Sequence, residues 1–313
     1  MTPQGIVFAF PWEVDLITWL QSCLSPGLIS VISRFSILGE GSLLAILLVF
    51  TYLCWDKRLG RFAALSLLTS NVFVTMTKGL VLRRRPYMSH ESIHLYRKIA
   101  PNADIHDIAA QGYSFPSNHS SASSSFFGAV AVHTRKALPV FLAIAVPLVV
   151  GFSRFVVGAH YPTDVLFGLA VGYLFSVLFH ALLRRGVKIG WIFNFFMAIG
   201  LLGVFYCRSN DAYNSLGLLW GFAIADRLQE KYVRFETIRD PLRILCRVVG
   251  AGLVYLLSSA LLRALFSLAG SSGILPLLLR AVRYALICLL VFFVYPMIFP
   301  LTGRIFTRRQ KTV

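Results

Sequence analysis

The sequence predicts an all-α protein, built as a polytopic bundle of transmembrane helices. Of its 313 residues, 57% are hydrophobic and only 14% are charged, and the mean hydropathy is +0.72. A soluble domain is usually about half apolar and about a quarter charged. Apolar segments of roughly 17 to 25 residues, the length of a membrane-crossing helix, recur along the chain. Because lipid offers no hydrogen bonds to the backbone, such segments are expected to be helical.

The first 39 residues differ from the rest, because their apolar run is broken at Pro26-Gly27 and carries Glu13, Asp15 and Arg34. We interpret residues 1–39 as two short helices at the membrane interface, with a single kinked span as the alternative. About nine spans follow. They are expected at about residues 40–55, 60–82, 117–133, 137–154, 162–183, 190–207, 212–226, 246–265 and 276–301.

The distribution of basic residues predicts which side of the bundle faces the cytoplasm. If the spans alternate, one side receives Lys57, Arg58, Arg61, Arg135, Lys136, Arg184, Arg185, Lys188 and the basic residues of 226–243 and 304–311. Cytoplasmic loops are enriched in Lys and Arg, so this side is the expected cytoplasmic face. The net charge of +17 is spread over these loops and forms no single stripe, which argues against nucleic acid as a partner. The five scattered cysteines indicate neither a disulfide framework nor a metal knuckle.

Three polar stretches fall on the opposite face, where basic residues should be scarce. The first runs from Ser153-Arg154 to His160 and Asp164. Pro162 suits the first turn of a helix, so Asp164 is within reach of His160, four residues before it. A carboxylate behind an imidazole fixes its tautomer and makes it a better base or nucleophile. The alternative is an ion pair at a helix end.

The other two stretches lie at the ends of the neighbouring spans. Lys78 and Arg85 are seven residues apart, which is two helical turns, so both can point to one side; Pro86 is expected to end that helix at Arg85. Ser117 is a good N-cap for the next span, whose free N–H groups favour an anion. Snorkelling cations and a simply capped helix are the alternatives. Together, the three stretches predict a phosphate site.

In order and spacing, these stretches resemble the three signature motifs of the type-2 phosphatidic acid phosphatase (PAP2) superfamily. The residues that carry the resemblance are Lys78…Arg85-Pro86, Pro116-Ser117-Asn118-His119 and Ser153-Arg154…His160…Asp164. The family usually has Gly in place of Asn118, and Asn is the residue that next best tolerates left-handed geometry. We therefore expect activity to survive, with some effect on phosphate fit or substrate range.

The resemblance implies metal-independent hydrolysis of a phosphate or diphosphate monoester, without a cofactor. It implies that His160 attacks phosphorus, that Asp164 orients it, and that His119 protonates the leaving group and then activates water. The implied phosphate-binding residues are Lys78, Arg85, Ser117, Asn118 and Arg154. The loop 87–115 is expected to form a lid or substrate-facing rim. Its His90 and His94 have metal-like spacing, but a metal site needs three or four ligands, so none is predicted.

These observations divide the chain into interfacial helices (1–39), a PAP2-type catalytic core (40–185) and accessory transmembrane helices (186–313). The predicted protein is a lipid phosphatase of a bacterial plasma membrane, with an amphiphilic phosphorylated lipid as substrate and the active site facing outward. A lipid phosphotransferase with the same phosphohistidine is the first alternative. A transporter or scaffold with a relic site is the second. The sequence leaves a soluble phosphate substrate and a homodimer open.

Overall fold

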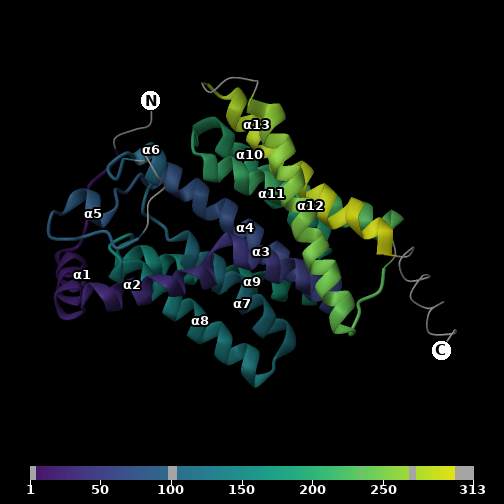
Figure 1. Ribbon diagram of the computed structural model, residues 1–313, viewed down its shortest axis with the longest axis horizontal. Coiled ribbons are helices and arrows are strands. Elements are labelled where there is room, and N and C mark those ends of the chain that lie inside the picture. Colours follow the sequence, from purple (N-terminus) through teal and green to yellow (C-terminus); the bar gives the residue numbers. More distant parts are fainter. Residues whose placement is uncertain (1–4, 98–103, 234, 268–272, 300–313) are drawn as a thin grey trace.

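The computed structural model describes residues 5–97, 104–233, 235–267 and 273–299, and most of these residues lie in helices (Figure 1). Helices α4 and α7 to α13 form the bundle, and α1 and α2 lie at one end of it. Within the described residues, extended pairing is limited to an isolated bridge between Ile6 and Arg83. The predicted all-α fold is therefore confirmed.

The N-terminal region contains two helices, α1 (Pro11–Cys23) and α2 (Pro26–Arg34), and a 3-10 turn, η1 (Phe35–Gly39), continues α2. Ser25 caps α2 by accepting a hydrogen bond from the backbone N–H of Leu28, and Pro26 occupies its first position. The pair bends by 113° at the break between them. The two helices are as predicted, whereas their position relative to a membrane stays a prediction.

The core consists of α4 (Lys57–Val81), α7 (Asn118–Thr134), α8 (Ala137–Val156) and α9 (Pro162–Arg184). A short helix, α3 (Gly41–Phe50), precedes it and continues as the π-helical turn η2 (Thr51–Trp55). Helices α7 and α9 approach closely because Gly168 and Gly172 face Ser117, Ser121 and Ser124 without a side chain between them. This close packing fixes the starts of α7 and α9, which carry two of the predicted motifs, against each other.

The C-terminal helices are α10 (Ile189–Tyr206), α11 (Asn210–Tyr232), α12 (Pro241–Ser267) and α13 (Leu275–Leu289). Two short turns, η3 (Leu290–Val294) and η4 (Tyr295–Ile298), continue α13. Helix α10 packs on α4, and α11 packs on both α4 and α13. The accessory helices therefore lie directly against the core.

Six helices in the described residues are long and apolar enough to cross a membrane, or seven if the bent α1–α2 pair is one span. They are α4, α8, α9, α10, α12 and the segment Leu275–Ile298. The predicted segment 40–55 is a shorter apolar helix, Gly41–Trp55. Helix α7 has only 17 residues and buries five serines, and α11 carries charges at both ends. The predicted number of nine spans is therefore not confirmed, although all nine segments are helical in their described parts.

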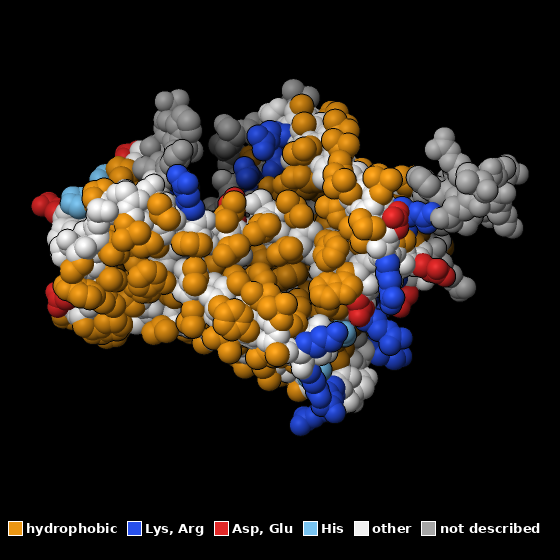
Figure 2. Space-filling model, turned by 60° about the horizontal axis from the view of Figure 1, so that its bottom comes forward, with side chains coloured by type: hydrophobic (Ala, Val, Ile, Leu, Met, Phe, Trp, Pro, Cys, Tyr) orange, Lys and Arg blue, Asp and Glu red, His pale blue; other side chains and the backbone are white. Residues whose placement is uncertain are grey.

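The basic residues that orient the bundle gather at one end of it. Arg58, Arg61 and Arg184 line a shallow cavity of about 320 Å³ there, together with His133 and His180. Figure 2 shows this group of basic and histidine side chains at the lower right of the view. The start of α4 and the ends of α7 and α9 thus share a basic pole, and the three predicted motifs lie at the opposite pole.

Candidate active site

The first motif is not helical to its end, which corrects the prediction. Helix α4 ends at Val81, and Leu82 caps it in the left-handed conformation, with φ at 54°. Leu82 and Arg84 then hydrogen-bond the backbone of Ile6, so the chain continues as an extended segment. Pro86 begins a new short helix, α5 (Pro86–Ser89). The N-terminal segment supplies the backbone partners that the sequence pattern could not reveal.

The side chains of Lys78 and Arg85 nevertheless lie near each other, because they hydrogen-bond the carbonyl groups of consecutive residues. The Lys78 ammonium donates hydrogen bonds to the carbonyl oxygens of Tyr113, at 2.8 Å, and Ser114, at 3.3 Å. The Arg85 guanidinium donates to the carbonyls of Gln111 and Gly112. The segment before α7 therefore orients both cations, and neither is paired with a carboxylate among the described residues.

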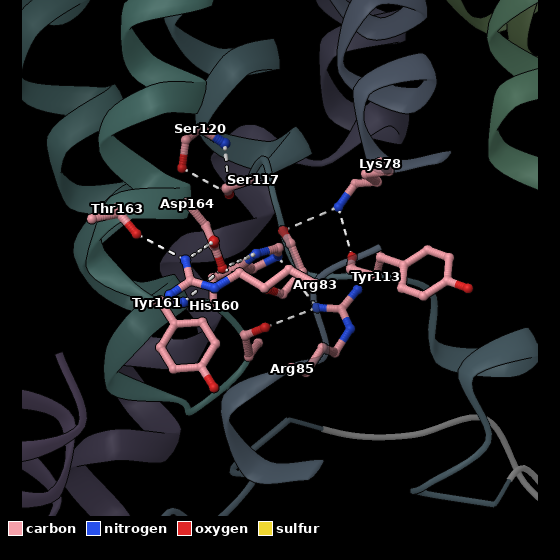
Figure 3. Close-up of polar contacts among 12 residues, drawn as sticks. Lys78, Arg83, Arg85, Tyr113, Ser117, Ser120, His160, Tyr161, Thr163 and Asp164 are labelled. Atoms are coloured by element: carbon pink, nitrogen blue, oxygen red, sulfur yellow. Dashed lines mark hydrogen bonds and ion pairs between the residues drawn. The ribbon is translucent and has the colours of Figure 1, made fainter. Parts of the chain in front are cut away.

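His160 sits in a tight turn between α8 and α9. Gly158 makes this turn possible, because its φ is +76° and an added Cβ would lie 2.5 Å from the carbonyl oxygen of His94. His160 is only 3% exposed, and its Nε2 lies 3.3 Å from Nη1 of Arg85. Arginine only donates hydrogen bonds, so Nε2 must be the acceptor and a neutral His160 carries its proton on Nδ1 (Figure 3). The nitrogen with the free electron pair therefore faces the cations.

Asp164 lies on the other side of that ring, as predicted, but it does not hydrogen-bond the histidine. Its Oδ2 is 3.6 Å from Nδ1 of His160, and it accepts hydrogen bonds from the Ser114 hydroxyl and the Tyr161 backbone N–H, both at 2.8 Å. The other oxygen, Oδ1, accepts from Arg83 at 2.7 Å. Asp164 is thus held in place from several directions, with its charge directed toward the histidine.

Arg83 and Glu13 complete this network, and the sequence pattern assigned neither a role. Arg83 is fully buried and forms ion pairs with Glu13 at 2.6 Å and Asp164 at 2.7 Å. Its guanidinium lies 3.8 Å from the centroid of the Tyr161 ring. Glu13, also fully buried, accepts two hydrogen bonds from Thr163. An acid in an apolar segment is a functional candidate by default, but this rule applies equally to Asp15 and so does not single out Glu13.

The start of α7 supplies the remaining motif. Ser117 is the N-cap, because its side chain accepts a hydrogen bond from the backbone N–H of Ser120, and its own N–H donates to the carbonyl of Asp164. Asn118 is the first helical residue and does not adopt a positive φ, so the left-handed explanation for its usual glycine is wrong. Its buried Oδ1 has no partner. Burial, and then the positive charges of Arg154 and His160, lower the pKa of His119 well below its ordinary value.

Positive charge dominates the centre of this site. Arg154 is 3% exposed, and its side chain forms neither a hydrogen bond nor an ion pair with a described residue. Burial, and then the charges of Arg85, Lys78 and Arg154, lower the pKa of His160 well below its ordinary value. Burial together with Arg97 lowers the pKa of Arg85 to about 10. Such a site stabilises an anion and keeps its histidine neutral.

The segment from 87 to 115 covers one side of the site, in its described parts. Its helix α6 (Ile108–Gln111) ends at Gln111, whose side chain accepts a hydrogen bond from Arg97 at 2.6 Å. Within the described ranges, no three His, Cys, Asp or Glu side chains lie close enough to share a metal ion. Residues 98–103 of this segment lie outside the described residues, and a role for the segment as a lid stays a prediction.

Fold and site together define a multi-span helical membrane protein with a buried cationic site around a neutral histidine. The chain belongs to the PAP2 superfamily. The PAP2 superfamily model matches residues 59–188. The model described as PAP2 superfamily phosphatase, transmembrane extension, matches residues 213–304. The predicted family is therefore confirmed, and most of the accessory C-terminal helices correspond to a recognised extension of it.

Individual relatives resemble parts of the chain. A lipid A 1-phosphatase of Rhizobium etli is 32% identical over 128 residues, which are 41% of this chain and 50% of that protein. A decaprenylphosphoryl-5-phosphoribose phosphatase of Mycobacterium tuberculosis is 30% identical over 165 residues, covering 51% of this chain and 84% of that protein. The crystal structure of Aquifex aeolicus LpxE has 22% identity and a TM-score of 0.47, covering 55% of this chain and 98% of that one. The chain thus spans about half the length of the lipid A 1-phosphatases that it matches.

Proposed function

We propose that this protein is a membrane phosphatase that hydrolyses lipid phosphate or diphosphate monoesters through a phosphohistidine at His160. The observation that carries the proposal is the arrangement at Nε2 of His160. This nitrogen accepts a hydrogen bond from Arg85, so its electron pair faces the buried arginines Arg85 and Arg154 and the half-buried Lys78. None of these three cations has a carboxylate partner among the described residues. A phosphoryl group carries the negative charge that these cations need.

The chemistry then proceeds in two steps. Nε2 of His160 attacks phosphorus while the bond to the leaving oxygen breaks, and His119 donates a proton to that oxygen. Water next attacks the phosphohistidine, His119 accepts a proton from it, and the P–N bond breaks to release inorganic phosphate. Lys78, Arg85 and Arg154 stabilise the charge on the phosphoryl oxygens in both steps. The backbone N–H groups at the start of α7 add to this stabilisation.

The substrate class follows from the surroundings of the site. The ring centroids of Phe115 and Phe167 lie 4.8 Å apart, with the rings tilted by 43°, beside the starts of α7 and α9. The outer faces of α8 and α9 expose many large apolar side chains. A lipid can therefore bring its headgroup to the site from the side. Matching relatives are named as phosphatases of lipid A and of a decaprenyl-linked sugar phosphate. We assign as the substrate a lipid with a phosphorylated sugar headgroup, or a polyprenyl chain that carries a phosphate.

We place the protein in a bacterial plasma membrane, with its basic pole in the cytoplasm and the site facing outward. Cytoplasmic loops carry most Lys and Arg, and the basic residues of this chain gather at the pole opposite His160. Cysteine labelling of intact cells tests this orientation. A cysteine at Ser92, beside the site, should react with an impermeant reagent, and one at Lys136 should not. The reverse pattern would refute the orientation.

The decisive experiment measures phosphate release by the purified protein across lipid and soluble phosphates. His160→Asn should abolish turnover and formation of a phosphorylated protein, while the matched variant of an exposed histidine, His94→Asn, should keep both. Turnover by His160→Asn at the wild-type rate would overturn the proposal. Phosphate that appears on an added lipid, and not free in solution, would identify a phosphotransferase. Loss of activity with a chelator would contradict the metal-independent mechanism.

A further inference from the structure

The cavity at the basic pole is lined by side chains that the proposed chemistry does not use. It lies among the starts of α4 and α10 and the ends of α7 and α9, and its volume is about 320 Å³. Ligand pockets usually measure about 300 to 1,000 Å³, so this space can hold a small headgroup. Its lining combines three arginines (Arg58, Arg61 and Arg184) with two histidines and three apolar side chains.

Aromatic packing and polar contacts hold the histidines at the wall of this cavity. Phe62 is 3% exposed, and its ring contacts the imidazoles of His133 and His180, with centroid distances of 6.4 and 6.0 Å. Nε2 of His180 lies 3.3 Å from Nη2 of Arg135 and must accept that hydrogen bond, because arginine only donates. Nε2 of His133 lies 3.6 Å from Oδ2 of Asp56. The wall is therefore ordered by contacts within the protein.

The arginines of the lining carry positive charge that the protein only partly neutralises. Arg61 pairs with Asp226 at 2.9 Å and with Glu230 at 3.0 Å. Arg58 and Arg184 form no ion pair with a described residue, and no described carboxylate lines the cavity. Guanidinium groups bind phosphate through paired hydrogen bonds. The two unpaired arginines therefore favour a phosphate group as the ligand.

The start of α10 adds to this preference for an anion. This helix begins beside the cavity at Ile189, and no side chain caps it. The first N–H groups of such a helix lack backbone partners, and its dipole is positive at this end. The arginines and the helix start thus attract the same kind of ligand from different elements.

The position of the cavity indicates that the phosphate belongs to a lipid. Helices α4, α9 and α10 are long and apolar enough to cross a membrane, and the cavity lies where they begin or end (Figure 2). The ends of membrane-crossing helices lie at the level of the lipid headgroups. Phe62, Leu183 and Ile189 make the rest of the lining apolar, which suits an amphiphile. Basic pockets between transmembrane helices are known to bind anionic headgroups.

We propose that this cavity binds the phosphate of an anionic membrane lipid, with Arg58 and Arg184 as the principal contacts. The site lies at the pole opposite His160, so the inference does not depend on the proposed function. Arg58 belongs to the start of α4 and Arg184 to the end of α9. A phosphate held by both bridges two helices of the core, and anionic lipid therefore stabilises the folded bundle.

The test measures the thermal midpoint of the full chain in nonionic detergent, because a ligand that binds only the folded state raises this midpoint. The probes are short-chain phosphatidylglycerol, phosphatidylcholine with the same chains, and inorganic phosphate. Phosphatidylglycerol should raise the midpoint, and the other two should not. A rise with inorganic phosphate at the same concentration would assign the cavity to free phosphate and overturn the lipid source.

The double substitution Arg58→Gln with Arg184→Gln should weaken the apparent affinity for phosphatidylglycerol by about tenfold or more. Both side chains are exposed, so the midpoint without lipid should stay near that of the wild type. The matched control, Lys136→Gln with Arg185→Gln, removes the same charge from the same pole outside the lining. It should keep the wild-type response, and Arg58→Lys with Arg184→Lys should recover part of the affinity.

Two results would overturn the proposal. Equal losses in the double variant and its control would show diffuse attraction to the basic pole, and an unchanged response of the double variant would show that the lipid binds elsewhere. Lipid bound at the candidate active site is tested by repeating the titration in the Arg154→Gln background. The effect of the two cavity substitutions should persist there, and its disappearance would place the lipid at the active site and refute the cavity site.

Discussion

Arg83 and Arg85 are separated by one residue and are both buried, yet their surroundings are opposite in kind. Arg83 has two carboxylate partners, Glu13 and Asp164, within 2.7 Å. Among the described residues, the Arg85 side chain hydrogen-bonds carbonyl oxygens and the ring of His160 and pairs with no carboxylate. Removing one partner of a buried ion pair is strongly destabilising, whereas a buried charge without a partner itself opposes folding. We infer that the first arginine holds the site together and that the second binds the substrate.

The largest expected effect is a loss of activity when a buried arginine without a carboxylate partner is replaced. Arg154→Gln should lower kcat/KM by roughly 10³-fold, about 4 kcal/mol, because one cation that stabilises the transferring phosphoryl is lost. Its thermal midpoint in detergent should not fall, because no ion pair is broken. Arg61→Gln is the matched control, since Arg61 pairs with Asp226 and Glu230 at the other pole. This control should lose stability and retain its kinetic constants; the reverse pattern would contradict the comparison.

Replacing the arginine that has carboxylate partners should affect stability. Arg83→Gln should lower the free energy of unfolding by about 3 kcal/mol, because Glu13 and Asp164 would then be buried without a cation. Denaturant or thermal unfolding in detergent measures the change. A double-mutant cycle with Glu13→Gln should show coupling of roughly 1 kcal/mol or more, because the two residues share a contact. Independent, additive effects of the two substitutions would show that the ion pair contributes nothing.

A smaller effect is expected in the pH profile. The neutral form of His160 is the nucleophile, and its pKa is lowered by burial and by Arg85, Lys78 and Arg154. The decline that neutral His160 causes should therefore lie below the ordinary histidine value of about 6.5. The folded protein should also lose stability there, because the unfolded state takes up that proton first. The need for a protonated His119 in the first step gives a separate decline toward higher pH.

Substituting Arg85 makes this prediction specific. The residual activity of Arg85→Gln should decline at a higher pH than that of the wild type, by about half a unit or more, because a positive neighbour of the imidazole is gone. Both pH profiles are measured with the same substrate, so the ionisation of its phosphate affects them equally. If the activity of Arg85→Gln declined at the same pH as the wild type, or at a lower pH, His160 would not control the decline.

The smallest effect concerns Asn118, which stands where the family usually has glycine. Asn118→Gly should raise kcat/KM for bulky phosphates by no more than about threefold, since it removes a side chain whose buried Oδ1 has no partner. Glycine in a helix costs up to about 1 kcal/mol, so the thermal midpoint should fall slightly. A tenfold loss of activity would assign the amide a direct contact with the substrate.

The sequence predicted the parts of this site that depend on local order. Ser117 caps α7, Pro162 opens α9, and Asp164 lies behind His160 because these features follow from spacing along one segment. It failed where distant segments meet. No periodicity indicates that Ile6 pairs with Leu82 and Arg84, so the helix was expected to continue to Arg85. The number of nine spans is not confirmed for another reason. Serines in α7 and charges in α11 lower the hydropathy of these helices, although both helices pack in the bundle.

The pairing of the N-terminal segment with the catalytic motifs has a practical consequence for anyone who redesigns this chain. Residues 6 to 13 supply backbone contacts to Leu82 and Arg84 and a carboxylate to Arg83. Deleting these residues therefore removes contacts that hold the first motif of the candidate active site in place. Affinity tags and fluorescent fusions attached just before this segment would compete with those contacts for space.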